Sequence, residues 1–537
     1  MTRDFAPLPS WHLAIAAIAL VAIVAGIVAQ LWIPLAPPIP GEFSDSVDYL
    51  VFADYFCGAF SGKLTPNVIS FFAVTRFPPL FPLALCASGA GLHATLNAYW
   101  LTAAFTIACF GLAAVWLVRE CKSLAGGLLV AAAFALAPGL HLLTLNPVSE
   151  PMFLAMTLST LLWSGRVEAG RGSLLTFALF AGLLPLCRMA GIAMVIAIAL
   201  WLHLRRVRSL RGRAIATAAM ILPVLSWFTY RRLMPVSLSY SDVAGLDHLI
   251  ETFGGWSAWM LGQPRRIADA YIESVSPWAH APGALIALFG FAFSAGWWLR
   301  IRRAALDAIA LTFYLGLIFC WPYPSETPRL IVVTLPMAGL CLWEAARWLF
   351  ERIPATSANA AEAAAFAIAA TVVAVSMPFM VEASGRALAP MDAELEPFRR
   401  SASFFRVTSR ASALELAELN ARVAAAMDET AHAIPQGECV YTFFPNALYA
   451  HGPSLDVRPM PFPPRDGKAT PDQFSDCRHV LVTYQTSWQL RQPLLYPMRQ
   501  ADGWLTPELV SRMKVRDEDV VAAALLRRIE SPARAAP

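Results

Sequence analysis

The chain has 537 residues and a formal net charge of +4; 57% of its residues are hydrophobic and only 15% are charged. Soluble domains are nearer to a quarter charged, so this composition is that of an integral membrane protein. The positive residues are spread over arginine-rich junctions between apolar runs, which excludes a nucleic-acid partner and indicates membrane topology instead.

Apolar runs of about twenty residues recur along the chain, and in a bilayer such runs form helices because the backbone finds no water. The first run, residues 11–33, lacks a clear cleavage site and predicts an uncleaved anchor. Further spans are expected at residues 93–118, 124–143, 151–165, 173–187, 191–203, 214–230, 282–299, 304–321, 330–346 and 361–380. The predicted fold class is therefore mainly α, a polytopic bundle of about eleven transmembrane helices.

Arginines cluster in every second junction between these spans, as at Arg119, Arg205, Arg300 and Arg347. Cytoplasmic loops carry such an excess of arginine and lysine. We therefore expect the amino terminus inside and the carboxyl terminus outside, in a bacterial inner (plasma) membrane. The other loops then share the outer, periplasmic face.

The first outer loop opens with PGEFSDSVDYLVFADYF, in which apolar residues alternate with Asp45, Asp48 and Asp54 at roughly helical spacing. This pattern predicts an amphipathic helix at the membrane interface. The loop ends with TRFPPLFPLAL, whose prolines stop regular helix and redirect the chain into the next span. For Asp48 and Asp54, solvation of a polar helix face is a sufficient explanation of the charge.

The tail, residues 384–537, becomes charged and mixed in composition. We predict an exoplasmic α/β domain there, distinct from a transmembrane catalytic domain over residues 1–383. The stretches ECVYTFF and HVLVTYQ predict strands, and ALELAELNARVAAAMDETAHAI predicts a helix. Cys439 and Cys477 lie beside the two predicted strands. From the sequence, they could form a disulfide or remain two buried free thiols.

Four ionisable residues are expected at the outer boundary of the membrane: Asp45, Glu150, Arg188 and Arg329. Charged groups at membrane depth are costly and mark functional sites by default. Arginine binds phosphate through a planar fork of donors, so two arginines suit a lipid phosphate, and a carboxylate suits a base. Taken singly, each arginine is equally well explained by snorkelling to head groups, and Glu150 by the dipole of the helix that Pro151 begins.

The order of short motifs along the chain carries further information. A transmembrane helix is followed by DSVDYLVFA, RFPPLFPLAL, SEPMFLAMTLSTLLW, CRMAGIAM and ETPRLIVVTLPMAGL. This order, which runs through most of residues 11–340, resembles that of the GT-C membrane glycosyltransferases. The most similar branch contains the protein O-mannosyltransferases and the transferases that decorate lipid A with aminoarabinose or galacturonic acid.

The resemblance implies roles for individual residues. Asp45, followed by Tyr49 in a D-x-x-x-Y stretch, matches the proposed catalytic base, and Glu150 matches a second acid at the start of a later helix. Arg329 matches the arginine that holds the donor phosphate, and Arg188 matches an arginine before a glycine. The predicted catalytic residues are Asp45 and Glu150. The predicted substrate-binding residues are Asp48, Tyr49, Arg76, Arg188, Glu326 and Arg329.

Two positions depart from the family pattern. Ser46 follows Asp45 where many relatives have a glutamate. Phe77 precedes the proline pair where the aminoarabinose branch has a lysine, and Arg76 stands one step earlier. The first departure leaves open whether the site binds a divalent metal, and no metal ligand is assigned. The second weakens the inference that this protein uses the substrate of the aminoarabinose branch.

The predicted function is transfer of a sugar from a polyprenyl-phosphate donor to a lipid, glycan or protein acceptor on the outer face, with inversion at the anomeric carbon. The departing phosphate needs no general acid, so one carboxylate base and one or two arginines suffice. The competing interpretations are a transporter or flippase of a lipid-linked glycan, a surface-glycan polymerase or ligase of the same fold, and a non-catalytic receptor. The lack of a visible repeat in the sequence counts against the transporter.

Overall fold

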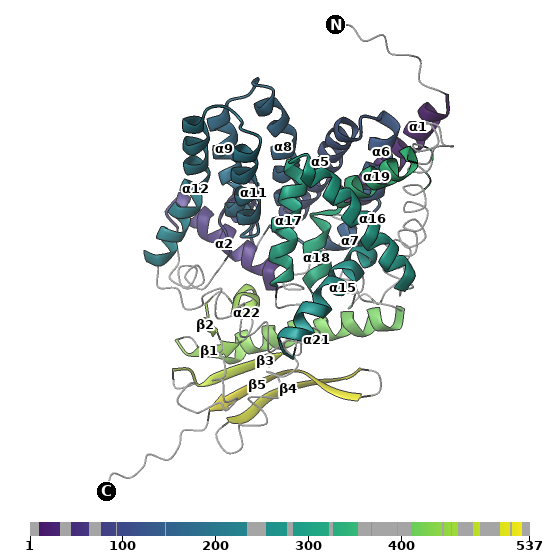
Figure 1. Ribbon diagram of the computed structural model, residues 1–537. Helices are drawn as coiled ribbons and strands as arrows, with labels where there is room; N and C mark the ends of the chain where they lie inside the picture. Colours follow the sequence, from purple (N-terminus) through teal and green to yellow (C-terminus); the bar gives the residue numbers. More distant parts are fainter. Residues whose placement is uncertain are drawn as a thin grey trace. The chain divides into compact units, whose positions relative to one another are not determined.

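The computed structural model describes residues 10–32, 44–63, 77–233, 254–275, 283–352, 410–459, 476–483 and 505–528, apart from gaps of one to four residues. The chain divides into two compact units (Figure 1). We call Met1–Leu35, Arg76–Ala84 and Ala98–Arg386 the helical unit. The mixed unit consists of Ala36–Thr75, Leu85–Asn97 and Ala387–Pro537.

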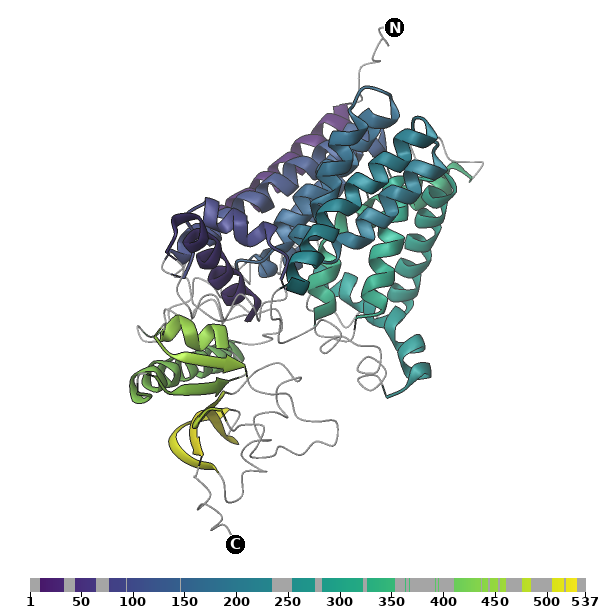
Figure 2. The same ribbon diagram turned by 90° about the vertical axis from the view of Figure 1, so that its left-hand side faces the viewer.

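The helical unit is a bundle of apolar helices (Figure 2). Ile18, Val21 and Phe291 are 66%, 69% and 72% exposed, which is the surface expected of helices that face lipid. Among the helices that the structure describes, three (α1, α5 and α12) contain segments long and apolar enough to cross a membrane. The described helices of the unit are α1 (Ser10–Trp32), α5 (Thr95–Cys121), α6 (Leu124–Ala135), α7 (Pro138–Leu143), α8 (Glu150–Glu168), α9 (Leu174–Gly182), α10 (Leu184–Cys187), α11 (Gly191–Leu204), α12 (Leu210–Leu233), α15 (Trp256–Val275), α16 (Gly283–Arg302), α17 (Leu306–Phe319), α18 (Thr327–Val332) and α19 (Leu335–Glu351).

Every predicted span up to residue 346 corresponds to a described helix or to two helices joined by a break. Two breaks lie where proline, which fits only the first turn of a helix, begins a new one: Pro138 opens α7, and Pro185 lies in the first turn of α10. The chain turns at Arg188, so the two short spans around it are separate, as predicted. The predicted span 361–380 lies outside the described residues.

The helix α15 was not predicted, because its sequence lacks an uninterrupted apolar run. Pro264, Arg265 and Asp269 all fall inside it. The helix is amphipathic instead, with Gln263 and Tyr271 on a buried side, and it packs against α7 and α18. A search for spans of about twenty apolar residues misses a helix of this kind.

The arginines of the predicted basic junctions gather at one end of the helical unit, where Arg119, Arg205, Arg300, Arg303 and Arg347 line one cavity of about 430 Å³. The side chain of Arg300 is only 5% exposed, and its guanidinium group donates to Asp307 at 2.7 and 2.8 Å and to Glu120 at 2.9 Å. Burial of this charge is tolerated because carboxylates surround it.

Glu168, the last residue of α8, also lines this cavity, whereas Glu150 is the first residue of the same helix. At about 1.5 Å per residue the two ends of α8 are roughly 27 Å apart. This length is close to the hydrocarbon thickness of a bilayer, about 30 Å. The basic cavity and Glu150 therefore lie at opposite ends of α8.

The mixed unit contains a five-stranded sheet with the strand order β2-β1-β3-β5-β4. The strands β2 and β3 run parallel to β1, and β5 runs antiparallel to both β3 and β4. With the helices α21 (Arg410–Ala433) and α22 (Pro445–His451), the sheet forms the C-terminal α/β domain that the sequence predicts (Figure 1). The strands are β1 (Cys439–Thr442), β2 (Asp456–Pro459), β3 (His479–Thr483), β4 (Leu505–Val515) and β5 (Glu518–Arg528).

The helix α2 (Ser44–Ser61) of the first loop belongs to the same unit as this sheet. Val47 and Val51 are 1% and 3% exposed and share one buried apolar cluster with Val440 of β1 and Leu448 of α22. Residues four apart lie on one face of a helix, so this face of α2 is part of the tail's core. The first loop and the tail are therefore built around a common core.

The second half of α2 is linked to the end of α4 (Leu80–Ala87) and to the segment that follows it. Cys57 forms a disulfide with Cys86. Three residues before Cys57, Asp54 accepts a hydrogen bond from the backbone N–H of Leu92 at 3.2 Å. Asp54 therefore does more than solvate a polar helix face. The disulfide was not predicted, since a separation of 29 residues between two cysteines carries no signal of its own.

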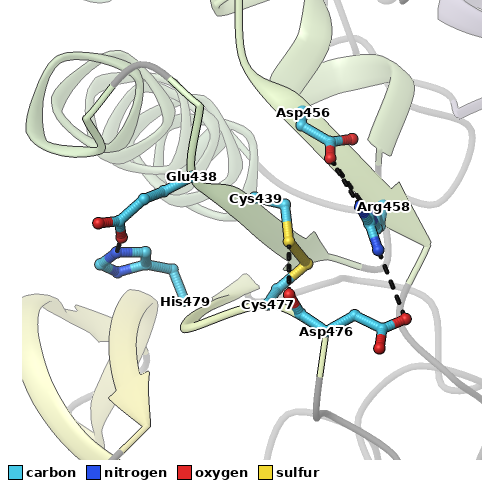
Figure 3. Close-up of a disulfide and its surroundings, with 7 residues drawn as sticks. All are labelled: Glu438, Cys439, Asp456, Arg458, Asp476, Cys477 and His479. Carbon is cyan, nitrogen blue, oxygen red and sulfur yellow. Dashed lines mark hydrogen bonds and ion pairs between the residues drawn. A yellow bond between two sulfur atoms is a disulfide. The ribbon is translucent and has the colours of Figure 1, made fainter.

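Cys439, at the start of β1, forms a second disulfide with Cys477, two residues before β3 (Figure 3). The sequence left this pairing open, and the structure decides it in favour of the disulfide. Beside the bond, Glu438 accepts a hydrogen bond from the ring of His479 at 2.8 Å, which joins the same two strands. The remaining cysteines are free thiols.

Candidate active site

Glu150 is the first residue of α8, and its side chain is only 1% exposed. Ser149 precedes the helix and Pro151 follows in its first turn, where the fixed φ of proline suits a helix start and its missing N–H costs nothing. The sequence SEP therefore begins the helix at this point. The amino end of the helix dipole also favours a carboxylate there.

Arg188 lies in the break between α10 and α11, where its backbone is extended (φ −153°, ψ 135°). One guanidinium nitrogen, Nη1, is 2.7 Å from Oε1 of Glu150 and donates a hydrogen bond to Oγ of Ser149 at 3.3 Å. The side chain is 15% exposed. The break in the helical path thus brings a charged side chain back to the start of α8.

Gly191 keeps this break tight, and replacing it by alanine is expected to displace Arg188. A Cβ at residue 191 would lie 2.4 Å from the carbonyl carbon of Leu184, a backbone atom that a rotamer change does not move. We expect Gly191→Ala to destabilise the protein by roughly 1–3 kcal/mol. Thermal unfolding of the purified protein measures this effect. The control is Gly316→Ala, because a Cβ there meets nothing within 4 Å; equal unfolding temperatures for both variants would contradict the prediction.

Arg329 reaches the same carboxylate from a third segment. It lies on the six-residue helix α18, and its Nε pairs with Oε1 of Glu150, the oxygen that Arg188 also approaches. Its side chain is 15% exposed. Glu326 is the residue at the N-terminal cap of α18, and its carboxylate accepts a hydrogen bond from the indole of Trp321 at 3.1 Å.

Packing around these three charges is apolar and dense. Tyr314 of α17 is 2% exposed, stacks on Phe153 of α8 at 6.2 Å and donates its hydroxyl to the carbonyl of Leu330 at 3.2 Å. In surroundings of this kind charges interact more strongly than in water. Tyr314 and Ser149 were not predicted as site residues; for Ser149, its place directly before Glu150 was the available signal.

The cluster of Glu150, Arg188 and Arg329 carries two guanidinium groups and one carboxylate, a formal net charge of +1. Both guanidinium groups are paired with this carboxylate, and the ion pairs offset part of the cost of burying the charges. That arrangement favours an orienting role for Glu150, which holds two guanidinium groups close together. Planar arginine donors match the oxygens of a phosphate.

The other predicted site residues lie elsewhere in the chain. Asp45 is in the first turn of α2, with its side chain outside the described part of the structure. On the same helix of the mixed unit, Asp48 is half-buried and Tyr49 is 1% exposed. Arg76 lies outside the described residues. Within the described ranges, no group of three or more His, Cys, Asp and Glu side chains is placed to hold a metal ion.

No family model matches the chain, and no curated protein matches it by sequence. An oligosaccharyltransferase from Archaeoglobus fulgidus, crystallised with a tethered acceptor peptide that contains the NVT sequon, matches in structure with a TM-score of 0.50. The identity is 12%, over 96% of this chain and 74% of that chain. ArnT from Cupriavidus metallidurans matches with TM-scores of 0.48 when bound to undecaprenyl phosphate and 0.45 in the apo state. Both ArnT matches have 12% identity and cover 96% of this chain, with 98% and 97% of those chains.

These structural neighbours are GT-C glycosyltransferases. At a TM-score of 0.50 over nearly the whole chain, the oligosaccharyltransferase match shows a shared fold. The chain therefore has the GT-C fold, a polytopic helical membrane part with a C-terminal domain that contains a small sheet. The order of the sequence motifs predicted this fold.

Proposed function

We propose that this protein is a glycosyltransferase that moves a sugar from a polyprenyl-phosphate donor to a lipid, glycan or protein acceptor on the outer face of the membrane. The observation that carries the proposal is the convergence of Arg188 and Arg329 on the buried carboxylate of Glu150. Arginines at the end of a membrane helix are costly unless they serve a ligand or a partner, and phosphate is the ligand that suits them. The GT-C fold supports the same function.

In the proposed reaction the bond between the anomeric carbon and the phosphate oxygen breaks, and the acceptor oxygen forms the new bond to that carbon. The polyprenyl phosphate leaves with the bonding electrons as a stable anion, so no general acid is needed. Arg188 and Arg329 stabilise its growing negative charge, and Glu150 orients both guanidinium groups. The proton of the acceptor goes to the carboxylate of Asp45, and displacement from the opposite side inverts the anomeric centre.

We further propose that the mixed unit lies outside the cytoplasm of a bacterial inner membrane. Its two disulfides, Cys57–Cys86 and Cys439–Cys477, support this orientation because such bonds persist in oxidising compartments. For the helical unit, we propose that the end with the cavity of junction arginines faces the cytoplasm, because cytoplasmic loops carry an excess of arginine.

An alkaline phosphatase fused after Pro537 is expected to be active, because the enzyme folds only outside the cytoplasm. The same reporter fused after Lys122, in the turn between α5 and α6, is expected to be inactive. A fluorescent protein that matures only in the cytoplasm should give the opposite pair of results. Phosphatase activity at residue 122 together with inactivity at residue 537 would reverse the proposed orientation.

Mass spectrometry of lipids and glycans from cells with and without the gene tests the proposed function. We expect the loss of one sugar-modified product and the accumulation of its polyprenyl-phosphate-linked sugar. Wild-type protein on a plasmid should restore the product, and Arg329→Ala should not. Identical glycans and lipid-linked sugars in both strains would refute the proposal.

A further inference from the structure

The helix α18, which carries Arg329, has only six residues. A helix of this length is unstable alone, because the cost of nucleation exceeds the gain from so few backbone hydrogen bonds. The position of Arg329 therefore depends on what α18 is fastened to. The contacts in question come from α15, the amphipathic helix that packs against it.

The first set of contacts holds the chain just before α18. Gln263 of α15 is 1% exposed and donates through Nε2 to the carbonyls of Phe319 at 3.0 Å and Trp321 at 3.3 Å. Trp259, one turn earlier, donates its indole N–H to the same Phe319 carbonyl at 3.0 Å. The last carbonyls of a helix have no partner within it, so α15 supplies the donors that the end of α17 lacks.

The connection continues from Trp321 to the start of α18. The indole of Trp321 donates to Oε2 of Glu326 at 3.1 Å, and Glu326 occupies the N-cap position of α18, three residues before Arg329. Gln263 thus holds the backbone of Trp321, and Trp321 holds the side chain of Glu326. The two hydrogen bonds use different groups of Trp321, its backbone carbonyl and its indole, so they are coupled through the position of this residue.

A second contact from α15 holds the other end of α18. The hydroxyl of Tyr271 and Oγ1 of Thr334 are 2.6 Å apart, and both side chains are buried. Thr334 in turn donates to the carbonyl of Ile331 in the last turn of α18. One helix therefore fixes both ends of the segment that presents Arg329.

We propose that Gln263 is a positioning residue for Arg329: through Trp321 and Glu326 it sets where the guanidinium stands for the donor phosphate. The inference rests on the proposed function, in which Arg329 binds that phosphate. It accounts for the burial of the Gln263 amide NH2, because the two hydrogen bonds to backbone carbonyls offset part of the cost of removing this group from water; the amide oxygen Oε1 is buried without a hydrogen-bond partner in the described part of the chain. Gln263 itself does not touch Glu150 or Arg329 in the described contacts.

The test compares Gln263→Leu, which keeps a similar volume but removes the donors, with Arg265→Leu, a change at a side chain 80% exposed on the same helix. We expect Gln263→Leu to raise the KM for the polyprenyl-phosphate sugar by roughly tenfold, with a smaller change in kcat. Hydrogen–deuterium exchange should rise in peptides that cover residues 319–334 and stay unchanged in those of α5 and α6. Trp259→Phe, which keeps an aromatic ring but removes one donor to Phe319, should give a smaller change in the same direction and serves as the readout if Gln263→Leu does not fold.

Binding of undecaprenyl phosphate, measured by native mass spectrometry, separates the two ways of failing. If Arg329→Ala loses binding while Gln263→Leu matches Arg265→Leu in KM and exchange, the positioning role is wrong and the proposed function stands. If Gln263→Leu loosens residues 319–334 but Arg329→Ala binds undecaprenyl phosphate like the wild type, the phosphate role of Arg329 is wrong.

Discussion

Replacement of Asp45 by asparagine is expected to abolish sugar transfer and to leave the folded protein in the membrane. Asparagine has nearly the same volume as aspartate, but its amide does not accept the proton of the acceptor. Loss of a general base typically slows a reaction by about 10²–10⁴-fold. The measurement is the initial transfer rate of purified protein in nanodiscs at saturating donor, with undecaprenyl phosphate binding as a check on the fold.

The matched control is Asp48→Asn, which changes the same residue type about one turn further along α2. We expect a much smaller effect, because Asp48 is proposed only to contact substrate. Near-normal and equal rates for the two variants would show that Asp45 is not the base. A complete loss in both would assign the chemistry to the acidic side of α2 rather than to one residue.

The second large effect is expected on donor dependence when Arg329 or Arg188 is replaced. Arg329→Lys keeps the positive charge but loses the planar fork, so the donor concentration at half-maximal rate is expected to rise tenfold or more. Arg188→Ala should give a defect of the same kind. Transfer rates measured against donor concentration for the wild type, both single variants and the double variant test this expectation.

The loss of apparent donor affinity in the double variant, expressed as a free energy, is expected to be smaller than the sum of the losses in the two single variants. The reason is that both guanidinium groups approach the same oxygen of Glu150 and are proposed to share one ligand. Arg205→Lys, at the opposite end of the helical unit, is the control and should leave donor dependence unchanged. An unchanged donor dependence in both single variants would mean that the arginines do not bind the donor, and the proposed function would lose its main support.

The parts of the fold that follow from composition and period were predictable. Apolar runs predicted the helices, and the break at Arg188 was predicted as well. The break at Pro138 was not predicted, since it falls inside the predicted span 124–143. The contact among Glu150, Arg188 and Arg329 was partly predictable too, because charged residues at helix ends were expected at one membrane face. Their meeting at one carboxylate depends on tertiary packing and is visible only in the structure.

Other features depended on tertiary context alone. The strand β5 contains the alanine run AAALL, and alanine disfavours strands, so its pairing with β3 and β4 decides its conformation. The helix α15 gives no apolar run, and the disulfide between Cys57 and Cys86 gives no spacing signal. The role of α2 in the tail's core was hidden for the same reason, since its partners lie at the other end of the chain.

Two parts of one apolar cluster are synthesised far apart in time. Val47 and Val51 of α2 leave the ribosome early, whereas Val440 and Leu448, which share their apolar cluster, come near the end. At roughly 5–20 residues per second, a separation of about 400 residues lasts roughly 20–80 s. For that time the apolar face of α2 needs a substitute cover, either the lipid interface or a chaperone, and the mixed unit closes only after the sheet has been translated.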